Sequence, residues 1–189
     1  MPPPPLSRAE YPELSRPFFW EWGQIEGRFE LIDLLPPEEL ISNVRIVPFA
    51  NDRAVVIAIQ DHGMWDHPGG TLEPGESYLE AVERELAEEA GARLLEFHPF
   101  GLFHCRTLSE TPYRPHLPYP EFVMLAGYAE VELVTAPGNP PDGETITEVA
   151  AVDLDEACRR LGTRHDGNWQ AEMYRLAASI RSSRSAPGR

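Results

Sequence analysis

Basic residues are scarce in this 189-residue chain, which has 16 lysines and arginines against 31 aspartates and glutamates and a net charge of −15. A charge of this sign repels nucleic-acid backbones and anionic membrane surfaces at long range. We therefore expect neither nucleic acid nor membrane as a partner. An anionic substrate would need a metal ion or a local group of arginines in order to approach this protein.

Cysteines and long apolar runs are also lacking. Cys105 and Cys158 are the two cysteines, and they lie far apart without the spacing of a metal site. No uncharged apolar stretch reaches the roughly 18 residues of a membrane helix, and the N-terminus lacks the charged-then-apolar pattern of a secretion signal. These absences predict a cytoplasmic protein with reduced thiols.

Proline is abundant instead, with 20 residues, and Pro2 to Pro5 form a run that favours extended geometry without packing. We expect residues 1 to about 15 to be a loose tail and residues 183–189 to be a flexible C-terminal tail. The aromatic residues at 18–22 either cover the core or form a subunit contact, so a homodimer is one alternative.

Hydrophobic periodicity predicts a mixed α/β chain. Asn51-Asp52 supplies the turn of a hairpin, and residues 106–120 form a long proline-rich loop. The predicted strands cover residues 28–34, 43–49, 53–60, 94–105, 121–134 and 145–152. The predicted helices cover residues 77–90, 153–161 and 166–180.

The helix at 77–90 has clear start and stop signals. Ser77 is an N-cap with Glu80 three residues later, which is the pattern of a capping box. Gly91 stands where a left-handed C-cap belongs. An apolar stripe at spacings of three and four residues faces the core; it consists of Leu79, Val82 and Leu86.

The opposite side of this helix carries three carboxylates. Glu85, Glu88 and Glu89 lie at positions i, i+3 and i+4, which share one helix face. Like charges at this spacing repel one another, so the cluster favours a positive partner. Oxygen ligands suit Mg²⁺ or Mn²⁺ better than zinc. The alternative for such a charge run is a solvated acidic face.

Residues 70–92 resemble the signature of the Nudix hydrolases. That signature has Gly, five residues, Glu, seven residues, Arg-Glu, an aliphatic residue, any residue, Glu-Glu, any residue, Gly and an aliphatic residue. Here its fixed positions are Gly70, Glu76, Arg84, Glu85, Leu86, Glu88, Glu89 and Gly91. Ala92 departs from the usual final Ile, Leu or Val, which affects a packing contact.

The resemblance implies a fold and an organisation. The fold would be a Nudix-like α/β/α sandwich with a mixed β-sheet. The Nudix hydrolase domain would cover residues 42–182, preceded by an N-terminal extension over residues 1–41 that includes the proline-rich tail.

The resemblance also implies a Mg²⁺- or Mn²⁺-dependent reaction in which water attacks a diphosphate. The implied metal ligands are the Gly70 carbonyl and the side chains of Glu85, Glu88 and Glu89. Glu85 or Glu89 would act as general base through a bound water, with Glu144 and Glu148 as loop alternatives. Arg84 would support the loop structurally by pairing with Glu76 or Glu73.

Substrate contacts are less clearly marked, because residues 54–70 contain no lysine or arginine. In the 106–120 loop, Arg106, Arg114 and His116 are candidates for binding a diphosphate, and Tyr113 or Tyr119 for stacking on a base. The alternative is a surface loop that prolines restrain. His67 and Trp65 are either further substrate contacts or structural residues of the turn.

We therefore expect a hydrolase that cleaves the diphosphate linkage of a small nucleoside diphosphate derivative of the nucleotide-sugar or ADP-ribose type. The alternatives are a nucleoside triphosphate pyrophosphatase that removes unwanted nucleotides and a non-catalytic nucleotide-binding regulatory module.

Overall fold

A computed structural model describes residues 6–60, 64–140, 143–162 and 168–185. Within these residues nine strands form one sheet, whose main path runs β1-β2-β7-β8-β3-β4-β5, with β6 paired to β3 and β9 paired to β4. The strands are β1 (Phe18–Trp20), β2 (Ile25–Leu31), β3 (Ile41–Ala50), β4 (Arg53–Ile59), β5 (Met64–Asp66), β6 (Gly69–Thr71), β7 (Ala92–Thr107), β8 (Glu121–Leu133) and β9 (Ile146–Val152).

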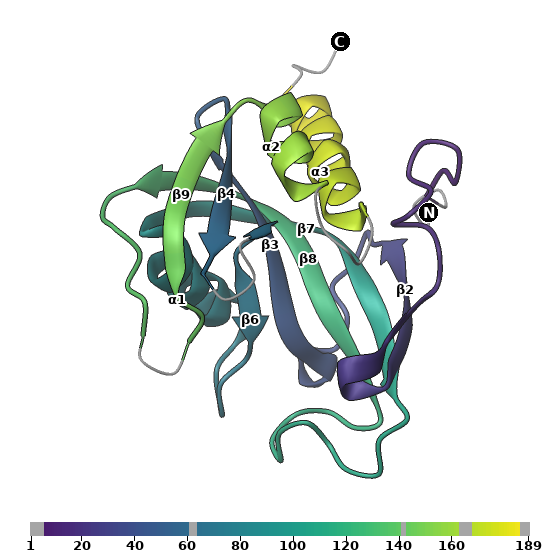
Figure 1. The fold of residues 1–189 in the computed structure, drawn as a ribbon. Helices are drawn as coiled ribbons and strands as arrows, with labels where there is room; N and C mark the ends of the chain where they lie inside the picture. Colours follow the sequence, from purple (N-terminus) through teal and green to yellow (C-terminus); the bar gives the residue numbers. More distant parts are fainter. Residues whose placement is uncertain (1–5, 61–63, 141–142, 163–167, 186–189) are drawn as a thin grey trace.

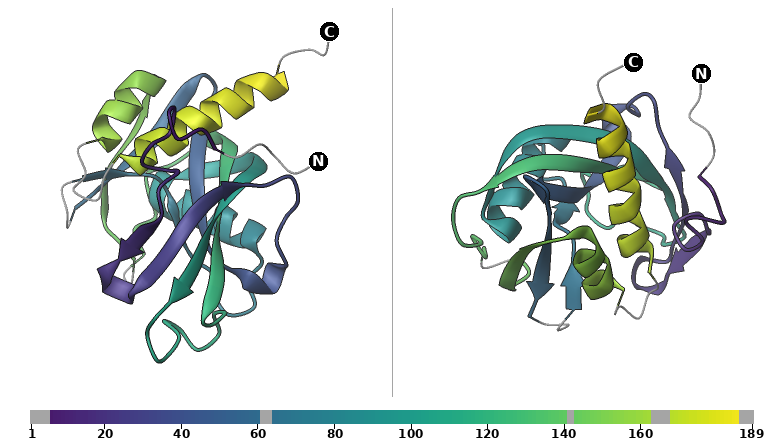
Figure 2. Two further views of the ribbon diagram at one scale, coloured as in Figure 1. Left: turned by 90° about the vertical axis from the view of Figure 1, so that its right-hand side faces the viewer. Right: turned by 90° about the horizontal axis from the view of Figure 1, so that it is seen from above.

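Three α-helices complete the fold, namely α1 (Tyr78–Ala90), α2 (Leu154–Leu161) and α3 (Trp169–Ser185), with short 3₁₀ turns at Glu21–Gly23 and Glu38–Leu40. The sheet is mixed because β3 runs parallel to β8, whereas β7 and β8 are antiparallel. Helix α1 lies on one face of the sheet, and α2 and α3 lie together on the other (Figures 1 and 2). The predicted α/β/α sandwich is confirmed.

Two apolar clusters fill the spaces between these layers. One joins α1 to β3, β4 and β8 through Val82, Leu86 and their neighbours. The other joins α2 and α3 to the opposite face through Met124, Met173 and Tyr174. Side chains alternate between the two clusters along β3, since Val44 belongs to the first and Val47 to the second. Among the described helices, none combines the length and the apolar character that crossing a bilayer requires.

Most of the predicted elements are confirmed, with shifted ends. The hairpin turn at Asn51-Asp52 joins β3 and β4, and Asn51 has a positive φ of 54°. Helix α3 continues to Ser185, so the predicted C-terminal tail is helical at 183–185; residues 166–167 and 186–189 lie outside the described residues. Strand β1 was not predicted, because three aromatic residues in a row give no alternation to read.

The N-terminal segment is more ordered than the sequence indicates. Tyr11 and Leu14 are buried, and the carboxylate of Glu172 in α3 accepts hydrogen bonds from the backbone N–H groups of Glu13 and Leu14, at 3.0 and 2.7 Å. The expected loose tail is therefore wrong for residues 11–14. A buried carboxylate needs donors, and these two amides supply them.

Two of the aromatic residues at 18–22 cover the core, which is one of the two alternatives given for this segment. Phe18 and Trp20 stack with ring centroids 4.1 Å apart, and both rings pack against Phe103 of β7. Phe19 and Trp22 point outward and are exposed. Strands β1 and β2 thus extend the same sheet that carries α1.

Candidate active site

Helix α1 is held in place at both ends. Ser77 and Glu80 form the predicted capping box, and Gly91 has a φ of 58° at the C-cap. A Cβ on Gly91 would lie 2.2 Å from the carbonyl oxygen of Thr135, so only glycine fits there. Val82 and Leu86 are fully buried, as predicted. Leu79 is exposed instead.

Arg84 ties this helix to the preceding loop. Its guanidinium donates to both carboxylate oxygens of Glu76, at 2.8 and 3.0 Å, and to the carbonyl oxygen of Thr71 at 3.1 Å. Glu76, and not Glu73, is therefore the partner of Arg84. Adjacent residues of a helix point about 100° apart, yet Nη1 of Arg84 donates to Glu85 at 2.8 Å and to Glu88 at 3.3 Å. The long side chain curls back along the helix.

Two of the three carboxylates are withdrawn from water. Glu85 is 6% exposed, and a Cβ on Gly70 would lie 1.9 Å from its Oε1, so the glycine leaves room for the carboxylate. Glu89 accepts a hydrogen bond from the Gly69 N–H at 2.9 Å. On the predicted acidic face, β6 thus covers Glu85 and contacts Glu89, whereas Glu88 stays partly exposed.

Burial sets the electrostatics of this pair. Burial raises the pKa of Glu85 more than the neighbouring Arg84 lowers it. Burial, followed by the charge of Glu85, raises the pKa of Glu89 to about 8, while the Gly69 N–H opposes the rise. Arg84 offsets the burial of Glu85 only in part, and the hydrogen bond from Gly69 does the same for Glu89. A cation placed between the two carboxyls would favour their ionised forms.

The donors fit a hard divalent cation in kind, because the carboxylates are oxygen ligands close to one another. In the described residues, however, no three such side chains converge on one point. Arg84 holds one oxygen each of Glu85 and Glu88. Holding a metal would therefore require these oxygens to exchange the guanidinium for the ion.

The two loop candidates for general base occupy different places. Glu144 is close enough to Glu89 that its charge raises the pKa of Glu89. Glu148 of β9 pairs with Ala58 of β4, and its carboxylate lies 3.6 Å from Arg160 of α2. Of the two, Glu144 is the one whose charge acts on the helix carboxylates.

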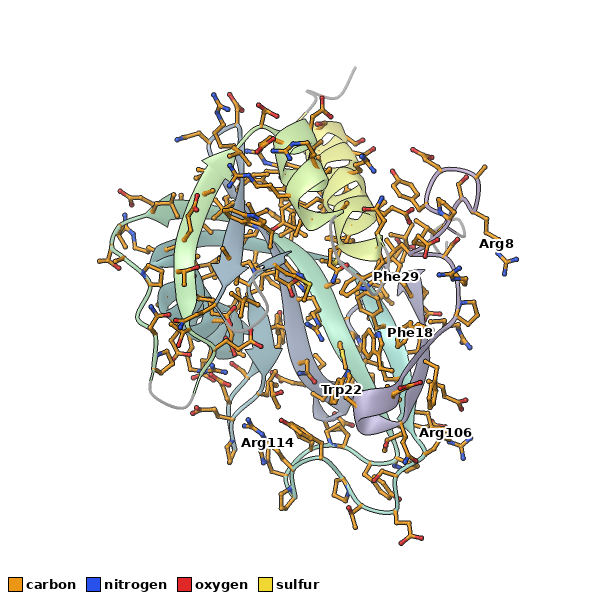
Figure 3. The ribbon with its side chains drawn as sticks, in the orientation of Figure 1. Arg8, Phe18, Trp22, Phe29, Arg106 and Arg114 are labelled. Atoms are coloured by element: carbon orange, nitrogen blue, oxygen red, sulfur yellow. The ribbon has the colours of Figure 1, made fainter. Side chains whose placement is uncertain are left out.

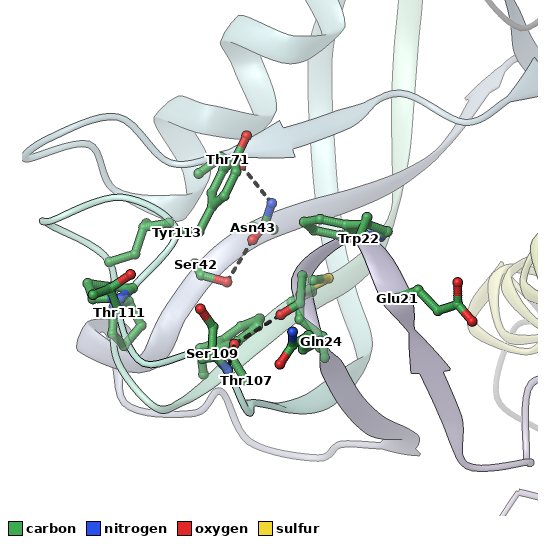
Figure 4. A pocket seen from close by; sticks show the side chains of 17 residues that line it. Glu21, Trp22, Gln24, Ser42, Asn43, Thr71, Thr107, Ser109, Thr111 and Tyr113 are labelled. Atoms are coloured by element: carbon green, nitrogen blue, oxygen red, sulfur yellow. Dashed lines mark hydrogen bonds between the residues drawn. The ribbon is translucent and has the colours of Figure 1, made fainter.

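A cavity of about 440 Å³ reaches β6 at Thr71 (Figure 4). Its polar lining includes Ser42, Asn43 and Thr71, and its aromatic lining includes Trp22 and Tyr113. The two exposed aromatic rings meet edge to face at 6.1 Å. Asn43 Nδ2 donates to Thr71 Oγ1 at 2.9 Å. The volume lies within the range of small-molecule pockets.

Thr71 joins the cavity to the carboxylate helix. Its side chain lines the cavity, whereas its carbonyl oxygen accepts from Arg84. Gly70, which lies against Glu85, is the adjacent residue in the chain. Neighbouring residues of β6 therefore contact the cavity and the carboxylate of Glu85.

The predicted substrate residues of the 106–120 loop are divided by the fold. Tyr113 lines the cavity, and the Arg114 guanidinium lies 5.7 Å from the centre of its ring. Arg106 points to the outer side of β7 (Figure 3), because Cys105 faces the core and side chains alternate. The fold therefore brings Tyr113 to the cavity with Arg114 beside its ring, and leaves Arg106 away from the cavity.

Three of the four remaining candidates make contacts within the protein. Nε2 of His116 lies 2.9 Å from the carbonyl oxygen of Leu72, and the Tyr119 hydroxyl donates to the Ser109 carbonyl at 3.0 Å. His67 is buried, with Nδ1 2.6 Å from Asp66.

Trp65 anchors the turn on its other side. Its ring lies 4.2 Å from the guanidinium of Arg160 in α2. This contact matches the structural alternative for Trp65.

Sequence reasoning missed the polar residues of β3. Asn43 and Arg45 alternate with Val44 and Ile46, so two polar side chains share a face of a strand that is otherwise buried. That spacing was visible in the sequence and marks a face turned toward a ligand or toward solvent.

Comparison with known proteins agrees with the signature. The family model described as the NUDIX domain matches residues 39–176, which is more than half of the chain. The chain belongs to the Nudix family. The motif at residues 70–92, helix α1 and the carboxylates lie within the matched part. As a Nudix protein, this chain has an extension of about 38 residues ahead of the match.

Individual relatives resemble this Nudix protein over shorter or more distant matches. Over 53 residues it is 42% identical to the "8-oxo-dGDP phosphatase NUDT18" of Mus musculus, covering 25% of this chain and 16% of that protein. The chain thus spans about a sixth of the length of this curated relative.

Two solved structures share the fold. One is a mutant of the Bacillus subtilis pyrophosphohydrolase BsRppH, with a TM-score of 0.54, 18% identity, and coverage of 89% of this chain and 96% of that one. The other is a NUDIX hydrolase from Nitrosomonas europaea, with a TM-score of 0.52, 21% identity, and coverage of 73% and 90%. At these identities the likeness concerns the fold.

Proposed function

We propose that this Nudix protein hydrolyses the diphosphate linkage of a nucleoside diphosphate derivative with Mg²⁺ or Mn²⁺. The observation that carries the proposal is the position of Thr71, which links a cavity with an aromatic rim to buried carboxylates on α1. A diphosphate at the carboxylates and a nucleoside in the cavity would be contiguous. Nucleotide-sugar and ADP-ribose-type compounds have this layout.

The residues have separate roles in this proposal. The Gly70 carbonyl and the side chains of Glu85, Glu88 and Glu89 would hold the ion. A divalent ion in such a site offsets phosphate charge and activates water. Glu89 would accept the proton of the attacking water, because its carboxylate lies at the Gly69–Gly70 turn, where it accepts a hydrogen bond from the Gly69 N–H. Glu76 and Arg84 fix the loop that carries Gly70.

The cavity supports the nucleoside part of the proposal. Base stacking on aromatic side chains tolerates different bases, and Trp22 and Tyr113 offer two such surfaces at its rim. The amide of Asn43 and the hydroxyl of Thr71 offer hydrogen bonds on its wall. Arg114, beside Tyr113, supplies positive charge for a phosphate.

A second candidate rests on the relative that is named for its action on 8-oxo-dGDP. An oxidised nucleoside diphosphate would fill the same cavity and present its phosphates to the same carboxylates. Triphosphates are the further alternative. A binding module that does not hydrolyse its ligand is the alternative from another class, and turnover separates it from the enzyme.

The deciding experiment is a product-release screen with Mg²⁺ and Mn²⁺. The substrates are nucleotide sugars, ADP-ribose, 8-oxo-dGDP, dinucleoside polyphosphates, coenzyme A and nucleoside triphosphates. We expect release from at least one diphosphate derivative and a loss of about 10²-fold or more in Glu89→Gln. Glu83→Gln, on the exposed side of the same helix, is the matched control and should retain activity. Ligand-induced stabilisation without release from any compound would identify a binding module.

A homodimer and a cytoplasmic location stay predictions, as do the domain boundaries at residues 42 and 182. The exposed Phe19 and Trp22 offer apolar surface at the edge of the sheet. Size-exclusion chromatography with light scattering measures the oligomeric state directly.

A further inference from the structure

Arg45 lies at the centre of β3 with its backbone between two strands. It pairs with Gly69 of β6 on one side and with Ala126 of β8 on the other. Its neighbours Val44 and Ile46 enter the apolar cluster beneath α1. The side chain of Arg45 therefore projects from the opposite face, which is the face of Asn43.

The surroundings of this guanidinium are poor in acceptors. Arg45 is half-buried, and its Nε is buried without a hydrogen-bond partner. Nη2 reaches the sulfur of Met124 at 3.6 Å, and a thioether is a weak acceptor. Within the described residues Arg45 has no ion pair, whereas Arg53, Arg84 and Arg181 each lie within 4.0 Å of a carboxylate.

The buried Nε of Arg45 disfavours the ligand-free fold. A donor withdrawn from water without an acceptor costs folding free energy that a bound acceptor restores. The nearby Cys105 offers no compensation, because burial raises the pKa of its thiol to about 12 even though Arg45 lowers it. An unsatisfied buried donor in a native structure calls for a ligand or an ordered water.

The position of Arg45 indicates which ligand this is. Met124, its sulfur contact, and Asn43, two residues along the strand, both line the cavity. Gly69, its backbone partner, donates to Glu89. Arg45 thus stands between the cavity and the turn that approaches the carboxylates. In a chain with a net charge of −15, Arg45 offers positive charge on the path that an anionic group of a ligand in the cavity would take.

We propose that Arg45 binds a phosphate oxygen of the substrate's diphosphate and thereby selects for ligands that carry this anion next to the cavity. The proposal relies on the proposed function for the identity of the substrate. The binding of a diphosphate group at Arg45 is testable separately with inorganic pyrophosphate. Arginine suits this role, since its planar fork matches phosphate oxygens.

The test compares the thermal unfolding of Arg45→Met and of Arg53→Met with that of wild type over increasing concentrations of pyrophosphate. The titration is done once in EDTA and once in Mg²⁺, at constant ionic strength. Both changes remove one arginine charge from neighbouring strands, so Arg53→Met is the matched control. We expect pyrophosphate to raise the melting temperature of wild type and of Arg53→Met and to leave Arg45→Met unshifted. Without ligand, Arg45→Met should melt at or above the wild-type temperature.

A structural role for Arg45 makes the opposite prediction. If the role is structural, Arg45→Met melts well below wild type and its melting temperature still responds to pyrophosphate as that of wild type does. That response overturns the proposal. The proposal also falls if pyrophosphate does not shift the melting temperature of wild type in either EDTA or Mg²⁺. Should Arg45→Met not fold, Arg45→Gln replaces it with the same expectation.

The compound that the product-release screen identifies gives a second readout. For that compound, Arg45→Met should raise KM about tenfold or more and change kcat by less than about threefold. An unchanged KM contradicts the proposal. If the screen finds no substrate, the pyrophosphate titration alone decides the role of Arg45. If the titration fails, any hydrolysis that the screen detects still supports the proposed function.

Discussion

At the scale of single residues, Glu89 shows best how surroundings prepare a side chain for function. On an exposed helix face its carboxyl would be ionised at neutral pH. Here burial and the charge of Glu85 raise its pKa to about 8, and one backbone N–H supplies only part of the compensation. In the ligand-free fold, ionising Glu89 is therefore unfavourable, and a cation close to the carboxylate would favour the ionised form.

This gives a prediction about the stability of Glu89→Gln. The folded pKa of Glu89 lies above the unfolded value near 4.3, so ionising this group costs folding free energy as the pH rises from about 4 to about 8. In the absence of metal, Glu89→Gln should match wild type at pH 4 and become the more stable protein at pH 8. Urea unfolding at several pH values measures the difference. Glu83→Gln should show no such trend, and a destabilised Glu89→Gln at pH 8 would contradict the argument.

At the scale of elements, the loop and helix of the Nudix signature form one hydrogen-bonded unit. Arg84 connects the second turn of α1 to Glu76 and to the Thr71 carbonyl, and Glu76 also accepts from the Glu73 N–H at 2.8 Å. These bonds hold Gly70 and Thr71 against the helix that carries the carboxylates. The unit fixes the site more directly than the capping box does, because the Ser77 cap lies about two turns away from Glu85.

The bond between Glu76 and Arg84 predicts a pH-dependent stability. Burial alone would raise the pKa of Glu76, but hydrogen bonds from Arg84 and from the Glu73 N–H outweigh it and lower the pKa. The stabilisation is therefore present above the unfolded pKa near 4.3 and is lost as the pH falls through the lower folded pKa. Glu76→Gln should cost about 1–2 kcal/mol at pH 7, with the deficit vanishing below the folded pKa. Denaturant titrations measure it, with Glu73→Gln as the control that should stay near wild type.

At the scale of the whole molecule, the N-terminal extension is part of the domain it precedes. Strands β1 and β2 continue the sheet beside β7, and Trp22 from this segment lines the cavity. Glu172 of α3 holds the chain ahead of β1 through the Glu13 and Leu14 amides. The two helices behind the sheet, the extension and the cavity are thereby connected.

Truncation tests this connection. Deleting residues 1–17 removes the buried Tyr11 and Leu14 and leaves Glu172 without these donors. Burying one such apolar side chain contributes about 1.5–3 kcal/mol, so the melting temperature should fall by roughly 5–15 °C. Deletion of residues 1–5 is the control and should have little effect. Differential scanning calorimetry of the two truncated proteins decides; equal melting temperatures would show that the extension contributes no stability.

The sequence alone determined the helix at 77–90, its caps, the shared face of Glu85, Glu88 and Glu89, and the strands that follow hydrophobic alternation. These features depend on spacings of two to four residues, which the backbone geometry of helices and strands converts directly into faces. Only the tertiary structure decided that Asn43 meets Thr71, that Glu172 holds residues 13 and 14, and that Arg45 forms no ion pair within the described residues. Such contacts depend on which strands pair across long stretches of chain, and no local pattern encodes that pairing.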